Sequence, residues 1–148
     1  MKLFRQDSNY AVRTLVFIAQ QNQSAPVSST RVSEALGLPR NFLRRIFSKL
    51  IRAGILYGTE GARGGVSLRK PPELITVAEI IFILQGDLKV CNVVHGKEIC
   101  PDQDTCVMRN RIVEIEKILL GEFHKITIAS LLEDANSLAR IESQDLEH

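Results

Sequence analysis

The stretch GLPRNFLRRIFSKLIRAG, residues 37–54, decides the fold predicted for this chain. Gly37 permits a tight turn, Pro39 suits the start of a helix, and Gly54 is typical of a helix end. The basic residues fall mainly on one side of this helix or at its start. The stretch therefore predicts a turn followed by a basic, amphipathic helix. Its apolar residues recur at the spacing of one buried helix face, namely Phe42, Leu43, Ile46, Phe47, Leu50 and Ile51.

Segments on both sides of this helix complete an order of elements. Tyr10–Gln21 predicts a first helix, and a serine or threonine at 29–30 can cap a short second helix. Two short apolar runs, at 55–57 and 66–68, predict strands, and the glycine-rich segment 58–65 joins them as a hairpin. This is the order of a winged helix-turn-helix, whose third helix enters the DNA major groove. The predicted fold class is mainly α with a small β-hairpin wing.

A net charge of +2 hides a strong separation of charge along the chain. Residues 1–70 contain 12 Lys and Arg and 3 Asp and Glu, a balance of +9. Residues 71–148 contain 7 and 14, a balance of −7. Chance arginines on solvated helix faces could give such a count, but a basic half is typical of a polyanion-binding surface. We therefore predict double-stranded operator DNA as a partner.

The candidate DNA contacts fall at the start of the second helix, along the third helix and at the hairpin tip. Arginine can bind guanine, and asparagine can bind adenine, through paired hydrogen bonds. Hydroxyls and free N–H groups at a helix start can bind phosphate, and an arginine between glycines can enter the minor groove. The predicted contacts are Ser28, Ser29, Thr30, Arg31, Arg40, Asn41, Arg44, Arg45, Lys49 and Arg63.

The second half predicts an appended helical region. Thr76-Val77-Ala78-Glu79 is a capping box that opens a helix ending at Gly86. Val107–Glu122 predicts a longer helix with an apolar strip, which needs a partner surface. That surface is either its own domain or a second copy of the chain, and we favour a homodimer because helix-turn-helix proteins normally read two half-sites. Thr127 can cap a last short helix, and beyond Asn136 the chain is polar.

These patterns predict five regions along the chain. Residues 1–70 form the winged helix-turn-helix, and 71–90 contain the linking helix. Residues 91–106 form a cysteine loop, and 107–135 contain the dimerisation helix and a short last helix. Residues 136–148 are expected to be a flexible tail, whose last three residues resemble an affinity-tag remnant.

All three cysteines of the chain lie in one 16-residue stretch, CNVVHGKEICPDQDTC, residues 91–106. A polar segment with glycine and proline is a poor place to bury apolar thiols but suits thiolates converging on a metal. The spacing lacks both the knuckle of a zinc site and the ferredoxin pattern. An iron–sulfur cluster is favoured, zinc is second, and free or redox-active thiols are the alternative. The candidate ligands are Cys91, Cys100 and Cys106, with His95 inside the loop.

Several classes of protein are not expected from this sequence. No run of about 18 uncharged apolar residues indicates a membrane span, and the N-terminus lacks a secretory pattern. An odd cysteine count without an export signal indicates a reducing cytoplasm rather than a disulfide framework. Because a nucleophile–base pair and a second cofactor motif are absent from the sequence, an enzyme or electron carrier is not predicted.

Five motifs spread over the chain are similar to those of one group of bacterial regulators. They are Tyr10-Ala11-Val12-Arg13, the helix at 39–54, the wing at 61–68, the Pro71-Pro72 junction and Ile75–Ile81. Together they resemble the IscR/NsrR family, also called the Rrf-two family, up to about residue 134. The resemblance implies a dimeric, cytoplasmic winged-helix transcription factor with a long dimerisation helix. It also implies that Cys91, Cys100 and Cys106 hold an iron–sulfur cluster that senses cluster supply, nitric oxide, iron or redox state.

The chain departs from the family at the fourth cluster ligand. IscR-like members place a histidine three residues after the last cysteine, where this chain has Arg109. NsrR-like members use an aspartate from the partner subunit just before the Tyr-Ala-Val-Arg motif. This chain has Asn9 there, with Asp7 two residues earlier. The candidates are therefore Asp7, Asn9, His95, a small molecule or no protein group, and both 2Fe-2S and 4Fe-4S clusters stay open.

The predicted function is a DNA-binding transcriptional regulator, a repressor, whose operator affinity an iron–sulfur cluster controls. Thiolate ligation would fix the cysteine loop against the long helix and so set the spacing of two recognition helices, as a population shift. The alternative is a cluster-free regulator on the same scaffold, controlled by thiol oxidation or by protein interaction.

Overall fold

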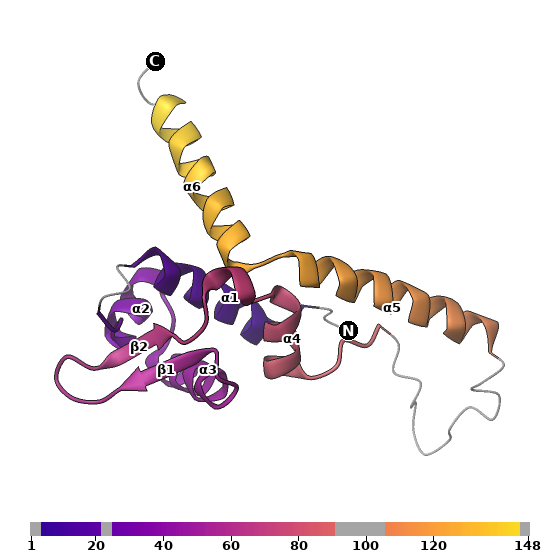
Figure 1. The fold of residues 1–148 in the computed structure, drawn as a ribbon, viewed down its shortest axis with the longest axis horizontal. Helices are drawn as coiled ribbons and strands as arrows, with labels where there is room; N and C mark the ends of the chain where they lie inside the picture. The colour runs from indigo at the N-terminus through magenta and orange to yellow at the C-terminus, as the bar shows by residue number, and fades with distance from the viewer. Residues whose placement is uncertain (1–3, 22–24, 91–105, 146–148) are drawn as a thin grey trace.

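The computed structural model describes residues 4–21, 25–90 and 106–145 of the chain. Helices dominate the described part, and a two-stranded antiparallel hairpin projects from it (Figure 1). This architecture confirms the predicted fold class. In chain order the elements are α1 (Gln6–Gln20), α2 (Ser29–Leu36), α3 (Arg40–Arg52), β1 (Leu56–Thr59), β2 (Gly65–Leu68), the 3-10 helix η1 (Pro72–Leu74), α4 (Val77–Gln85), α5 (Val107–Lys125) and α6 (Ile128–Asp145).

One hydrophobic core holds the first four helices and the hairpin together. It contains fully buried residues from each helix, including Leu15 of α1, Val32 of α2, Leu50 of α3 and Ile80 of α4. Of the predicted inner face of α3, four residues are buried. The prediction is wrong for Ile51, which is 38% exposed, and Phe42 is only half-buried. The buried four are Leu43, Ile46, Phe47 and Leu50.

The turn between α2 and α3 follows from local sequence signals. The Ser28 hydroxyl accepts a hydrogen bond from the Arg31 N–H at 3.2 Å, so the cap of α2 lies one residue before the predicted position. Gly37 ends α2 with a φ of 63°, a left-handed conformation that costs glycine little. Pro39 then caps α3, and Gly54, also left-handed, follows its end. The first helix α1 begins at Gln6 rather than at Tyr10 as predicted.

The capping box of α4 is present in part. The Thr76 hydroxyl accepts a hydrogen bond from the Glu79 N–H at 3.2 Å, as predicted. The Glu79 carboxylate instead accepts a hydrogen bond from the Lys70 amine at 2.6 Å, and so ties α4 to the end of the hairpin. Gly86 ends the helix with a positive φ.

Helices α5 and α6 extend away from the body in different directions (Figure 1). Their junction is fixed to the start of α4 by two backbone hydrogen bonds of 2.9 Å, from Val77 N–H to the Ile126 carbonyl and from Ile128 N–H to the Ile75 carbonyl. The helix α6 continues to Asp145, whereas a short helix and a flexible tail from residue 136 were expected. Its length follows from the Ala, Leu, Glu, Arg and Gln content of this segment, all good helix formers. None of the described helices is long and apolar enough to cross a membrane.

Candidate nucleic-acid interface

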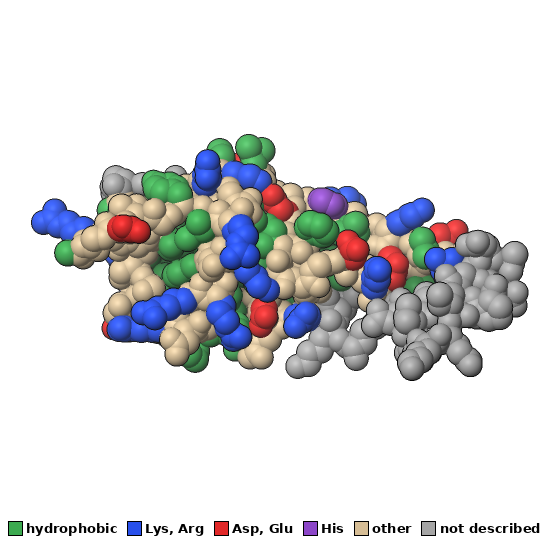
Figure 2. All heavy atoms as spheres, turned by 90° about the horizontal axis from the view of Figure 1, so that it is seen from below, with side chains coloured by type: hydrophobic (Ala, Val, Ile, Leu, Met, Phe, Trp, Pro, Cys, Tyr) green, Lys and Arg blue, Asp and Glu red, His purple; other side chains and the backbone are tan. Residues whose placement is uncertain are grey.

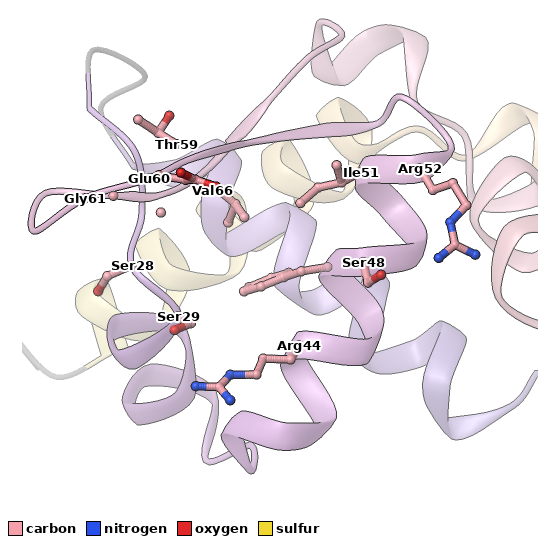
Figure 3. Close-up of a pocket in the computed structure, with 13 residues that line it drawn as sticks. Ser28, Ser29, Arg44, Ser48, Ile51, Arg52, Thr59, Glu60, Gly61 and Val66 are labelled. Atoms are coloured by element: carbon pink, nitrogen blue, oxygen red, sulfur yellow. The ribbon is translucent and has the colours of Figure 1, made fainter.

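A cleft of about 1090 Å³ opens between the start of α2, the recognition helix α3 and the hairpin (Figure 3). Arg44 extends from α3 below Ser29, and the hairpin backbone forms the opposite wall (Figure 3). The cleft therefore combines hydroxyls at a helix start, guanidinium groups and glycine-rich backbone, which are the groups that bind nucleic-acid phosphate. The polar side chains on its helical walls are Ser28, Ser29, Arg44, Ser48 and Arg52.

Two of these residues, Ser48 and Arg52, were not among the predicted contacts. They follow Arg44 at intervals of four residues, so all three lie along one side of α3. The periodicity that identified the buried face of α3 could have identified this side as well. Because Arg52 lies in the last turn of the helix, its charge alone did not separate it from a helix-capping residue.

The wing is fixed against the start of α2 by close backbone contact. Val27 and Val66 exchange two backbone hydrogen bonds of 2.9 Å. A Cβ at Gly65 would lie 2.4 Å from the Val27 carbonyl oxygen, so only glycine permits this approach. Arg63 is exposed at the hairpin tip, beyond the cleft. The close contact therefore positions the wing, with its arginine, beside the helix-turn-helix.

Aromatic contacts connect α1 with the first turn of the recognition helix. The rings of Tyr10 and Phe42 meet edge to face, with centroids 5.5 Å apart. The guanidinium of Arg45 lies 5.4 Å from the Phe42 centroid, and that of Arg13 lies 5.9 Å from the Tyr10 centroid. Such cation–π contacts restrict the rotamers of both exposed arginines. Arg13 is thus a further exposed basic residue close to the first turn of α3, and charge counting did not single it out.

The remaining predicted contacts differ in their exposure and in their position relative to the cleft. Arg40 and Asn41 are exposed in the first turn of α3, where a major-groove helix meets base edges. Arg31 is exposed on α2, and Thr30 is half-buried beside it. Lys49 does not line the cleft, and its amine donates a hydrogen bond to the Leu84 carbonyl at 3.1 Å. Of the ten predicted contacts, Ser28, Ser29 and Arg44 thus line the cleft, and Lys49 has a hydrogen-bond partner within the chain.

The surface charge agrees with this placement. Figure 2 shows Lys and Arg side chains spread over the winged-helix part, whereas basic and acidic side chains alternate along α5. Two of the acidic groups on α5 are paired with basic residues of the same helix, Glu114 with Arg111 at 3.2 Å and Glu122 with Lys125 at 2.6 Å. At the cleft, Arg44 and Arg52 are exposed beside the single acidic residue of its lining, Glu60, so the described lining has an excess of positive charge, which suits a polyanion.

Of the candidate metal ligands, the structure describes three. Cys106 is half-buried and is the N-cap of α5, and its carbonyl accepts a hydrogen bond from the Asn110 N–H at 3.1 Å. Asp7 and Asn9 lie in the first turns of α1, Asp7 half-buried and Asn9 exposed. Cys91, Cys100 and His95 lie outside the described residues. Within the described ranges no three His, Cys, Asp or Glu side chains are grouped to hold a metal ion.

Comparison with known proteins identifies the family. The family model of Rrf2, described as an iron-dependent transcriptional regulator, matches residues 4–134. The chain belongs to the Rrf2 family. It is therefore a DNA-binding transcriptional regulator and not an enzyme.

Solved structures agree with this assignment. The chain is 28% identical to T. potens IscR with a TM-score of 0.72, over 88% of this chain and 86% of that one. CymR of B. subtilis, the global cysteine regulator of that organism, is 22% identical with a TM-score of 0.74, over 90% and 98%. The oxidised form of Staphylococcus aureus CymR is 20% identical with a TM-score of 0.71, over 90% and 97%. The CymR structures share the fold with this chain.

Proposed function

We propose that this Rrf2 protein is a homodimeric repressor whose operator affinity is controlled by Cys91, Cys100 and Cys106, which hold an iron–sulfur cluster. The proposed DNA binding rests mainly on the cleft, in which Ser29, Arg44 and the wing face the same space. Arg40, Asn41 and Arg45 would face bases or phosphates from the adjoining part of α3. A repressor acts by occupying its operator, which needs no further surface on the protein.

The apolar side of α5 supports the homodimer. None of the residues of this 19-residue helix is buried, and four of its apolar side chains are 50–73% exposed. A row of this kind on a projecting helix is typical of an interface rather than of a free surface. A second copy of the chain is the occupant that would place two recognition helices on two half-sites. The four residues are Val107, Met108, Ile115 and Ile118.

The chemistry of the thiols supports the cluster. Cys106 lies at the N-terminus of α5, beside the free N–H groups of its first turn. Three soft thiolates within 16 residues suit iron–sulfur ligation. When bound, the cluster would supply reactivity toward oxidants and nitric oxide and dependence on iron. Asp7 or Asn9 of a partner copy, or His95, would complete the ligand set.

The position of Cys106 connects the thiols with DNA binding. Because Cys106 caps the helix that forms the proposed dimer interface, any change in its ligation or oxidation acts on one end of that interface. The relative position of the two recognition helices depends on the same interface. Two arrangements of the dimer with different operator affinities would then be populated according to the state of the thiols.

Anaerobic spectroscopy tests the cluster directly. Protein purified without oxygen should absorb visible light and contain iron and sulfide. Cys100→Ala should lose both the colour and the response of DNA affinity to the signal. His124→Ala is a matched control, because it removes an exposed potential ligand from the far end of α5 and should keep the colour. Colourless anaerobic protein with stoichiometric zinc would contradict the cluster.

A salt titration tests the DNA-binding face. The logarithm of the affinity should fall steeply with the logarithm of the salt concentration, because phosphate contacts release counterions. Arg44→Ala should weaken binding by about 1–3 kcal/mol. Arg111→Ala removes the same charge from α5, where the guanidinium pairs with Glu114, and should leave affinity unchanged. Affinity that is indifferent to salt would count against the face.

A cluster-free thiol regulator on the same scaffold is the second candidate. The likeness in fold to CymR, including its oxidised form, favours it. In this case a peroxide would oxidise the half-buried Cys106 thiol to a sulfenic acid, and a second cysteine would attack it with loss of water to form a disulfide in place of ligation. Thiol titration with and without reductant, together with iron analysis, distinguishes the candidates. Iron-free protein whose DNA affinity changes on reversible oxidation would favour the second.

A further inference from the structure

We propose that Lys49 is a positioning residue for the recognition helix rather than a DNA contact. It ties the C-terminal part of α3 to the last turn of α4. Through this tie, a change in the cysteine-bearing part of the chain reaches the DNA-binding face. The last step rests on the proposed function, in which the cysteines control operator affinity.

The contact of Lys49 has the geometry of a helix-end interaction. Its amine lies 3.1 Å from the carbonyl oxygen of Leu84, which is 35 residues away in the chain. Leu84 is the second-last residue of α4, so its carbonyl belongs to the four that have no partner within an α-helix. The C-terminal end of a helix is also the negative end of its dipole and attracts an ammonium group. Leu84 itself is buried, which fixes the position of the acceptor.

Lys49 also lies apart from the DNA cleft. With Arg52, Ala53, Phe82 and Ile83 it lines a separate hollow of about 410 Å³ between α3 and α4. Arg52 lines both spaces, whereas Lys49 lines only this one. The amine of the exposed Lys49 therefore lies at the contact between the two helices, whereas Arg52 also borders the cleft.

The residue after Leu84 holds the other side of the same turn. The side-chain oxygen of Gln85 accepts two hydrogen bonds from the start of α1, one from the Ser8 hydroxyl at 2.9 Å and one from the Arg5 N–H at 3.1 Å. Ser8 is fully buried. Two successive residues at the end of α4 thus connect α3 on one side with α1 on the other, and α1 carries the candidate ligands Asp7 and Asn9.

The chain then leads directly to the cysteines. The Val90 N–H donates a hydrogen bond to the Glu116 carboxylate of α5 at 2.6 Å, and Cys91 is the next residue. Residues 84–90 are therefore connected at one end to the recognition helix and at the other to α5, the helix that Cys106 caps. A shift of α5 relative to the body acts on this segment, and Lys49 is its hydrogen-bonded link to α3.

The test compares two variants that remove one positive charge from the same helix end. Lys49→Met keeps the length of the side chain without a donor, and Arg52→Met is the control. Affinity is measured for a fluorescent duplex that the wild-type protein selects from a random-sequence library. It is measured for protein reconstituted anaerobically with iron and sulfide, for metal-free reduced protein, and for metal-free protein oxidised with hydrogen peroxide. Each measurement is repeated over a range of salt concentrations.

The readout is the ratio of the highest to the lowest affinity among the three states. Lys49→Met should reduce this ratio at least ~fivefold, the lower end of typical coupling strengths, and should leave the salt slope unchanged. Arg52→Met should weaken binding in all states alike and keep the ratio, with a salt slope smaller by about 0.9 if Arg52 binds a phosphate.

Three results are decisive. If Lys49→Met weakens all states equally and lowers the salt slope by about 0.9, Lys49 binds phosphate and the proposal is overturned. Should Lys49→Met fail to fold in thermal unfolding, Lys49→Gln, which replaces the ammonium by a neutral amide on a shorter side chain, takes its place. Full retention of the ratio by the folded variant also overturns the proposal. If the wild-type ratio is one, the proposed function itself fails, and this outcome is distinguishable because it needs no variant.

Discussion

The helices α3 and α5 both carry apolar side chains at helical spacing, but most of these side chains are buried in α3 and exposed in α5. In α3, four apolar residues are buried inside the body, and its basic residues face solvent. In α5 no residue is buried, and Ile115 and Ile118 remain 50% and 65% exposed. An apolar stripe on a helix therefore indicates a partner surface, but that surface can belong to the same chain or to another molecule. For α3 the partner is its own core, and for α5 the proposed partner is a second copy of the chain.

The largest expected effect comes from truncating one residue of each stripe. Leu50→Ala should lower the free energy of unfolding by about 2–5 kcal/mol, because it leaves a cavity in the core. Ile118→Ala should change it by less than about 0.5 kcal/mol in dilute solution, where little of the side chain is covered. Urea unfolding at submicromolar concentration measures both. Equal losses would show that α5 packs within its own chain, as α3 does.

A charge introduced into the α5 stripe tests whether a second copy of the chain covers it. Ile118→Glu should raise the dimer dissociation constant at least ~100-fold, because an unpaired carboxylate would be buried at the interface. Lys117→Glu is the matched control, since Lys117 is exposed on an adjacent part of the helix and outside the apolar row. Sedimentation velocity over a concentration range provides the measurement. A monomeric wild-type protein, or an unchanged constant for Ile118→Glu, would contradict the interface.

The smallest expected effect concerns the outer side of α3. Phe42→Leu removes the ring that Arg45 covers, so Arg45 should lose a cation–π contact worth about 0.5–1 kcal/mol. DNA affinity should fall about 2–5-fold. Phe42→Tyr keeps the ring and should bind as the wild type does. Fluorescence anisotropy with a duplex distinguishes these outcomes, and a loss shared by both variants would show that packing against Tyr10 matters instead.

Features that depend on neighbouring residues could be predicted from the sequence. Gly37, Gly54 and the Thr76 cap have local causes, namely backbone conformation and a hydroxyl within one turn. The same holds for the hairpin, because glycines flank its turn. The winged helix-turn-helix and the basic side of α3 follow from these signals together.

Features that depend on distant residues could not be predicted. The charge and position of Lys49 predict a DNA contact. Its hydrogen bond to the Leu84 carbonyl, 35 residues away in the chain, has no signal in the neighbouring sequence. Helix α1 starts four residues earlier than predicted, with Ser8 in its first turns bonded to Gln85, 77 residues away. The polar stretch that includes Ser8 carries no apolar periodicity that would indicate a helix. Tertiary contacts therefore decide both positions.

The way α5 is held has a mechanical consequence. Backbone hydrogen bonds at Ile126 and Ile128 fix its C-terminal end to the body, the Glu116 carboxylate midway along it accepts a hydrogen bond from the Val90 N–H, and Cys106 lies at the opposite end. Its 19 residues give a lever of roughly 28 Å at about 1.5 Å per residue. A rotation of about 5° at the anchored pivot would displace the Cys106 end by roughly 2 Å over this length. A displacement of this size at the Cys106 end is as large as a bond rearrangement at a thiol. At the other end of α5 it corresponds to a small tilt that the body can tolerate.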